Sequence, residues 1–227
     1  MKKLLAVAII LASFVLFAQS RARCTESMSG SKQLSAPVFT APGFTFFGVD
    51  YSQVRLIGDH GHGAGTNMEP TQIRDKYFNA INELVFNEKK KYDFEKATGG
   101  KKITYDFSSV AKINLTANPA KMRNFSEHVP LNASEIRAMV KKYSLNTSAK
   151  NNIGMVLIAD KMDRVEAEAF YYVVFFNVAD RDVIFYSYVK GKPKGMGYRN
   201  YWAGAIYSIV RDMTRSDWKY WENTVMN

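Results

Sequence analysis

Cysteine is nearly absent from this chain, because Cys24 is the only one among 227 residues. A single cysteine forms no intrachain disulfide, so the stability of the protein must come from burial of an apolar core. The composition permits such a core, since 47% of the residues are hydrophobic and 14% are aromatic. We therefore expect one compact domain that is stabilised without covalent cross-links.

Motifs for nucleophilic catalysis and for nucleotide binding are missing as well. The sequence contains no Gly-x-Ser-x-Gly, the pattern that places a nucleophilic serine on a sharp turn. No glycine-rich segment ends in the Gly-Lys-Ser/Thr of a phosphate-binding loop. These absences favour a protein that is not an enzyme and argue against a nucleotide ligand.

The amino-terminal residues have the pattern of a cleavable export signal. Lys2 and Lys3 precede an apolar run at residues 4–17, and the small-x-small pattern of residues 18–20 is typical of a cleavage site. The run is shorter than the roughly 20 residues that a membrane-spanning helix needs. We expect residues 1–20 to be a signal peptide and the remaining chain to be exported, with no transmembrane span.

Cys24 lies where a bacterial lipoprotein carries its lipidated cysteine, but the residues before it do not fit that modification. They are Arg21, Ala22 and Arg23, whereas a lipidation signal has small residues there and an aliphatic one at the third position. The scarcity of cysteine favours a bacterial envelope, so we expect a periplasmic or outer-membrane-associated protein. Residues 21–43, rich in Ser, Thr, Pro and Gly, are predicted to be a flexible tether.

The remaining residues, 44–227, show the alternating patterns of strands and helices. Clusters of β-branched and aromatic residues predict strands at 44–57, 153–159, 169–178 and 183–189, and a strand or a broken pair at 103–115. Apolar residues at helical spacing predict helices at 70–86, 132–143 and 198–213. The order β-α-β-α-β-β-β-α predicts a single α/β domain of the α+β type, with a mixed β-sheet flanked by helices.

The charge balance indicates the kind of partner. The net charge is +10, which favours attraction to anionic surfaces. Residues 190–199 place cations among glycines just before the last predicted helix, and aromatic and arginine side chains, which dominate protein interfaces, follow. The candidate interaction residues are Lys192, Lys194, Tyr198, Arg199 and Trp202. The alternative is that Tyr201 and Trp202 belong to the core and Arg199 lies on a solvated rim.

A loop rich in histidine and glycine, residues 58–67, suggests a second kind of site. Asp59, His60 and His62 offer carboxylate and imidazole ligands that zinc, copper or nickel accept, and His128 would complete the set if the fold brings it near. Against this, alternate residues of an extended segment point in opposite directions. We expect no cofactor, and a metal-binding protein or metal-dependent hydrolase with a divalent metal in this loop is the alternative.

Two sets of segments carry resemblances to exported proteins. Residues 173–184, Val-Val-Phe-Phe-Asn-Val-Ala-Asp-Arg-Asp-Val-Ile, lie within a stretch that resembles the periplasmic α/β domains of the TolB amino-terminal and curli-assembly lipoprotein families. Residues 47–50, 73–77 and 195–202 are similar to segments of an uncharacterised group of exported Bacteroidetes proteins. The resemblances imply an envelope location and an α/β fold, and they carry no catalytic residue.

These observations together predict a non-enzymatic accessory or binding protein of the envelope that acts through protein interaction. The expected partner is an envelope protein or an anionic envelope component. A nucleic acid is not expected, because the chain is predicted to be exported.

Overall fold

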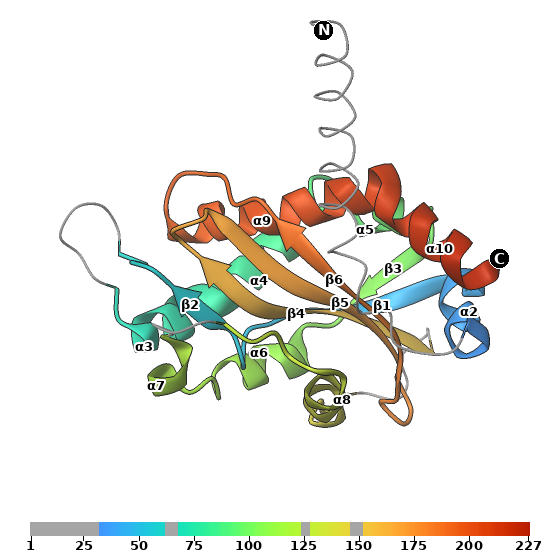
Figure 1. Cartoon of the computed structure of the whole chain (residues 1–227), viewed down its shortest axis with the longest axis horizontal. Coiled ribbons are helices and arrows are strands. Elements are labelled where there is room, and N and C mark those ends of the chain that lie inside the picture. Colours follow the sequence, from blue (N-terminus) through green and yellow to red (C-terminus); the bar gives the residue numbers. More distant parts are fainter. Residues whose placement is uncertain (1–31, 62–67, 124–127, 146–151) are drawn as a thin grey trace, which may run out of the picture.

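The computed structural model of the chain describes residues 32–61, 68–123, 128–145 and 152–227. These residues form a mixed sheet of six strands with helices on both faces (Figure 1), which confirms the predicted α/β architecture. Among the described helices, none has both the length and the apolar character that crossing a membrane requires. The predicted signal peptide, Cys24 and His62 lie outside the described residues.

The sheet has the strand order β3-β1-β4-β5-β6, and β2 pairs with β4 beyond the end of β1. Its strands are β1 (Gly43–Asp50), β2 (Arg55–Ile57), β3 (Lys102–Tyr105), β4 (Ile153–Asp163), β5 (Glu168–Asn177) and β6 (Val183–Gly191). The pairs of β1 with β3, β1 with β4 and β2 with β4 are parallel, whereas β4, β5 and β6 are antiparallel neighbours. The last two strands, β5 and β6, therefore form an antiparallel hairpin.

Helices cover both faces of this sheet. They are α2 (Lys32–Thr40), α3 (Pro70–Ile73), α4 (Asn79–Asn87), α5 (Phe94–Ala97), α6 (Ser108–Asn114), α7 (Pro119–Met122), α8 (Ala133–Lys141), α9 (Tyr198–Asp212) and α10 (Trp218–Met226), with π-helical turns η1 (Arg74–Phe78) and η2 (Met213–Asp217). One apolar cluster lies between the sheet and α2, α4, α9 and α10. A smaller cluster lies on the other face, under α6 and α8.

Two predicted strands differ from the structure. The segment 44–57 forms two strands, β1 and β2, because the Asp50 carboxylate accepts a hydrogen bond from the Ser52 backbone N–H at 2.8 Å and turns the chain. In the segment 103–115 only β3 is a strand. The Asp106 carboxylate accepts from the Ser108 N–H at 3.0 Å and starts the helix α6, which buries Val110 and Asn114 on one face.

The predicted tether also differs in the part that the structure describes. Residues 32–40 form α2, whose Val38 and Phe39 are buried. The Phe39 ring packs against Phe185 of β6 at 5.5 Å and against Trp218 of α10 at 5.0 Å between centroids. The packed body therefore begins before residue 44, because burial of these two apolar side chains stabilises the contact of α2 with the rest of the fold.

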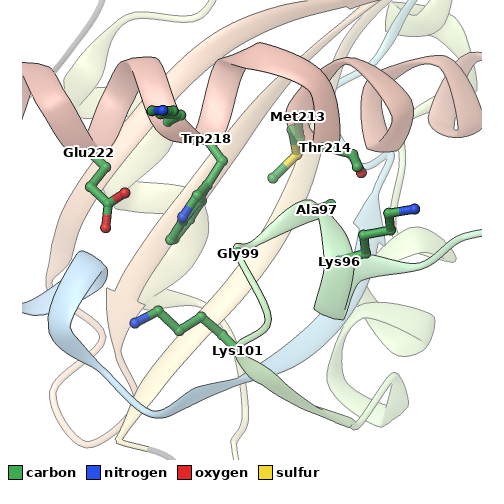
Figure 2. Close-up of a pocket in the computed structure, with 9 residues that line it drawn as sticks. Lys96, Ala97, Gly99, Lys101, Met213, Thr214, Trp218 and Glu222 are labelled. Carbon is green, nitrogen blue, oxygen red and sulfur yellow. The ribbon is translucent and has the colours of Figure 1, made fainter.

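The last helix continues past its predicted end, through η2 into α10. The π-helical turn Met213–Asp217 interrupts the regular helical hydrogen bonding, and such turns occur frequently at functional sites. Next to it lies a cavity of about 310 Å³ between α10 and the loop that follows α5 (Figure 2). Residues of both segments line this cavity, including Gly99, Lys101 and Trp218.

Candidate interaction surface

The glycine-rich loop between β6 and α9, residues 192–197, is packed tightly against α9. The Lys194 N–H donates a hydrogen bond to the Tyr201 carbonyl oxygen at 3.1 Å. A Cβ atom at Gly204 would overlap the Lys194 carbonyl oxygen, and one at Gly191 would overlap the Ala205 carbonyl oxygen. Only glycine fits at these two positions, so the path of the loop is fixed by close backbone contact.

This loop and the first turn of α9 expose cations around one apolar side chain. Lys192, Lys194 and Arg199 are exposed, and Met196 between them is 90% exposed. In the described part of the chain, none of the three cations forms an ion pair with a carboxylate. The amino-terminal end of the α9 dipole adds positive potential here. We call these four residues the basic loop surface; Figure 1 shows the loop that carries them in orange, beside α9.

Two of the predicted interaction residues are placed elsewhere by the structure. Trp202 is fully buried and Tyr198 is only 6% exposed, because both lie on the face of α9 that packs on the sheet. The Trp202 ring stacks on the imidazole of His60, with 5.3 Å between centroids and 12° between planes. The prediction was therefore wrong for these two side chains, which anchor α9 to the sheet. Tyr201 is half-buried.

His60 uses both ring nitrogens for contacts within the protein. Its Nε2 lies 3.2 Å from the Ile57 carbonyl oxygen and 3.1 Å from that of Met162, and since carbonyl oxygens only accept, Nε2 carries the proton. Nδ1 then accepts from the Tyr198 hydroxyl at 3.0 Å. Asp59 accepts from the Gly61 N–H at 2.7 Å and so closes a turn. A metal at His60 would have to replace Tyr198.

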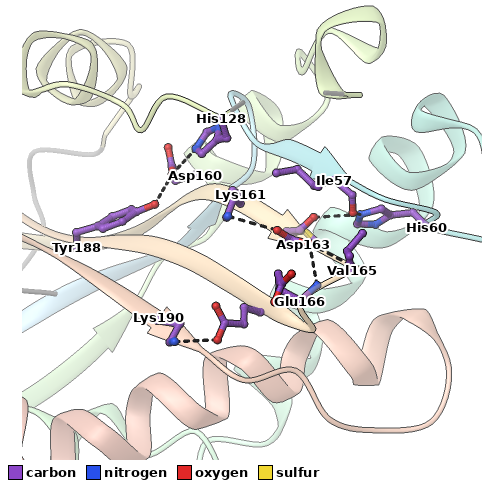
Figure 3. A network of polar contacts seen from close by, with 12 residues as sticks. Ile57, His60, His128, Asp160, Lys161, Asp163, Val165, Glu166, Tyr188 and Lys190 are labelled. Atoms are coloured by element: carbon purple, nitrogen blue, oxygen red, sulfur yellow. Dashed lines mark hydrogen bonds and ion pairs between the residues drawn. The ribbon is translucent and has the colours of Figure 1, made fainter. Parts of the chain in front are cut away.

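His128 lies on the other face of the sheet. Its Nε2 donates to Asp160 Oδ2 at 2.7 Å, and the Tyr188 hydroxyl donates to the same oxygen at 2.6 Å (Figure 3). The Leu131 N–H donates to Asp160 Oδ1 at 3.1 Å. Tyr188 packs with the cluster under α6 and α8, whereas the partner of His60, Trp202, belongs to the opposite cluster. The structure therefore does not bring His128 to His60.

Of the predicted metal ligands that the structure describes, His60 and His128 therefore lie on opposite faces of the sheet. In those residues, no group of three or more His, Cys, Asp or Glu side chains is close enough to hold a metal ion. His62 lies outside them, so the metal-binding alternative stays a prediction. Asp160 was missed by the sequence reasoning, although an acidic residue that ends a continuous apolar run at 153–159 was a signal.

The carboxyl end of β1, where ligands bind in many α/β sheets, is filled by protein side chains. Asn82 accepts from the Val49 N–H at 2.7 Å, and the amides of Asn82 and Asn114 both donate to the Val49 carbonyl oxygen. Asp50 is fully buried and accepts from the Tyr143 hydroxyl at 2.8 Å. Burial raises the pKa of the Asp50 carboxyl. These contacts hold the strand end in place and leave Asp50 a structural role.

The buried His60 predicts an acid-sensitive stability. Burial lowers the pKa of His60 to about 4, whereas an unfolded histidine titrates near 6.5. Between these values the unfolded chain binds the extra proton, so the free energy of unfolding falls as the pH falls from about 6.5 to 4. The contribution reaches roughly 2–3 kcal/mol near the lower limit. Urea unfolding at several pH values measures it.

The control is the His60→Phe variant, which keeps an aromatic ring against Trp202 but cannot take up a proton. We expect the variant to be less stable at neutral pH and to lose less stability on acidification than the parent chain. Equal pH slopes in the two chains would contradict the assignment of His60 as the titrating group.

The fold and the exposed residues define an α/β protein with a mixed sheet and a basic loop surface whose backbone packs closely against α9. Comparisons with protein families, with curated proteins and with solved structures find no match for this chain. The function is therefore inferred from the geometry and charge of the chain itself.

Proposed function

We propose that this chain is a non-enzymatic accessory protein of the bacterial envelope that binds an acidic partner protein through the basic loop surface. The observation that supports this most is Met196, which is 90% exposed between cations on a loop held by close contacts with α9. Methionine and arginine, both present on this surface, are enriched in protein interfaces relative to the rest of the surface. The predicted export signal supports the envelope location.

The rigidity of the loop favours binding. A segment that is already ordered loses little conformational entropy when a partner docks, so more of the contact energy appears as affinity. Met196 offers a polarisable, adaptable side chain for an apolar pocket of the partner. Lys192, Lys194 and Arg199 around it would steer an acidic surface toward the loop and fix its orientation.

The proposal is tested by reversing the charge of the surface. We expect the variant Lys192→Glu/Lys194→Glu/Arg199→Glu to lose a partner that the parent chain retains after chemical crosslinking in the cells that produce it, with at least a tenfold decrease in yield. The matched control is Lys90→Glu/Lys112→Glu/Lys121→Glu, which changes the net charge equally at three exposed lysines elsewhere. Equal retention of the same partner by both variants, or no partner for the parent chain, would contradict the proposal.

A further inference from the structure

We propose that the cavity beside Trp218 is a second binding site, for a small phosphomonoester. Its volume is about 310 Å³, at the lower end of the range for small-molecule sites. It lies at the η2–α10 end of the helix that begins at the basic loop surface, and the two share no residue. This inference does not depend on the proposed function.

One wall of the cavity is the turn that follows α5. Gly99 has a φ of +69°, a left-handed conformation that favours glycine, and its N–H donates to the Lys96 carbonyl oxygen at 3.3 Å. A Cβ atom at Gly99 would lie 2.8 Å from Trp218 Nε1. Any other residue here would place its side chain against the Trp218 ring, so the close packing of the turn on this ring requires glycine.

The opposite wall consists of η2 and α10, and its buried hydrogen-bond donor is the indole N–H of Trp218. Trp218 is fixed by the Phe39 ring at 5.0 Å and the Phe44 ring at 6.0 Å between centroids. Its Nε1–H has no acceptor in the described part of the chain, and Trp218 lines the cavity. The Thr214 hydroxyl is engaged, because it donates to the Val210 carbonyl oxygen at 2.8 Å. Trp218 therefore supplies a fixed donor for a ligand oxygen.

The charges around the cavity favour a dianion. Lys96, Lys101 and Lys219 line it together with a single carboxylate, Glu222 (Figure 2), and no ion pair in the described residues joins any of these lysines to an acidic group. Lys101 is positioned by donating to the Phe39 carbonyl oxygen at 2.8 Å. A phosphomonoester carries a charge of about −1.5 to −2 at neutral pH, which matches the excess of positive charge.

The cavity also offers a hydrogen-bond acceptor, Glu222, for the organic part of the ligand. Lysine ammonium groups bind phosphate as point charges, and Lys96 and Lys219 are exposed side chains that line the cavity from different elements. Glu222 accepts hydrogen bonds, so it suits a hydroxyl or ammonium group on the same ligand. The class that fits both features is a small phosphomonoester with at least one further hydrogen-bond donor, such as a sugar phosphate.

The test follows the indole N–H resonances of the ¹⁵N-labelled full chain during titration with glucose 6-phosphate. The chain has three tryptophans, and a Trp218→Phe variant assigns the resonance of interest. We expect a saturable shift of the Trp218 resonance with glucose 6-phosphate and none with glucose. In Lys96→Gln/Lys219→Gln the apparent dissociation constant should rise at least tenfold, and in the control Lys90→Gln/Lys121→Gln it should not change.

Three results would overturn the inference. They are the absence of a Trp218 shift at millimolar ligand, an equal shift with glucose, and an unchanged dissociation constant in the Lys96→Gln/Lys219→Gln variant. A phosphomonoester group can belong to a soluble metabolite or to a lipid headgroup, and a second experiment with phosphatidic acid vesicles separates these sources. Sedimentation of the chain with the vesicles but no response to glucose 6-phosphate would assign the site to a lipid headgroup and refute the soluble ligand. The charge-reversed basic loop variant should titrate like the parent chain, which separates this test from that of the proposed function.

Discussion

A chain that ends at Gly197 should aggregate rather than fold. The truncation removes α9, η2 and α10, and with them Trp202, Trp218 and Trp221, which are all buried. Loss of a buried tryptophan side chain costs about 3–5 kcal/mol, and a domain has a total stability of only about 5–15 kcal/mol. Three such losses together cost about 9–15 kcal/mol, which is as large as the whole stability of a typical domain.

The same truncation would expose an aromatic sheet. Phe44 of β1 packs against Phe175 of β5 at 5.0 Å, and both rings also contact Trp218 at 6.0 Å between centroids. Without the helices, the apolar faces of these strands lie open to other chains, and exposed segments of high β-propensity associate.

Size-exclusion chromatography and circular dichroism of the purified chains measure this outcome. A chain ending at Val225 is the control, because it lacks only Met226 and Asn227, which are exposed. It should remain monomeric with the circular dichroism spectrum of the parent. A soluble, monomeric and folded chain ending at Gly197 would show that the last helices are not needed for the fold.

Asp160→Asn should lower the free energy of unfolding by about 3–5 kcal/mol, the largest effect that we expect from a single isosteric change. Asp160 is fully buried, and its two oxygens accept from His128 Nε2, the Tyr188 hydroxyl and the Leu131 N–H. An asparagine replaces one accepting oxygen with a donating NH₂ group. Turned one way, the NH₂ group faces the Leu131 N–H; turned the other way, it removes the acceptor that the His128 N–H and the Tyr188 hydroxyl share.

Urea unfolding of the variant beside Asp182→Asn measures the effect. Asp182 is the matched control, because its exposed side chain pairs with Lys141 at the surface, where ion pairs contribute little. The control should stay within about 0.5 kcal/mol of the parent. A loss of less than about 1 kcal/mol in Asp160→Asn would show that the network around His128 contributes little to stability.

The sequence was sufficient to predict the strands and helices whose signals are local, such as a strand that is buried on both faces. β4 and β5 are covered on both faces, so their continuous apolar runs predicted strands without ambiguity. The helix α8 follows its N-cap residue Asn132 in a capping box, in which Asn132 accepts from the Glu135 N–H and Glu135 accepts from the Asn132 N–H. These signals are local, and no distant contact overrides them.

Other features depend on distant contacts that a sequence does not display. Residues 32–40 have no strong periodicity, and α2 is stable because Phe39 meets Phe185 and Trp218 across the fold. Ile113 alternates with polar neighbours as in a strand, whereas in the structure the Asp106 turn precedes a helix that buries Val110 and Asn114. The cavity beside Trp218 joins residues more than a hundred positions apart, so no local pattern indicated it.

Burial of two candidate interaction residues also depends on such contacts. Periodicity placed Tyr198 and Trp202 on one stripe of the last helix, and the stripe faces the core. The exposed apolar residue of this region is Met196, which the sequence did not single out because exposure of a loop side chain depends on how its backbone packs.

The most direct test of the proposed function is photocrosslinking from position 196 in the cells that produce the chain. With p-benzoylphenylalanine in place of Met196, we expect one predominant crosslinked partner, which is absent when the probe replaces Leu115, an apolar residue that is 50% exposed at a distance from the loop. The Lys192→Glu/Lys194→Glu/Arg199→Glu background should abolish the product. No product from position 196, or the same products from positions 196 and 115, would contradict the assignment of the basic loop surface as the binding site.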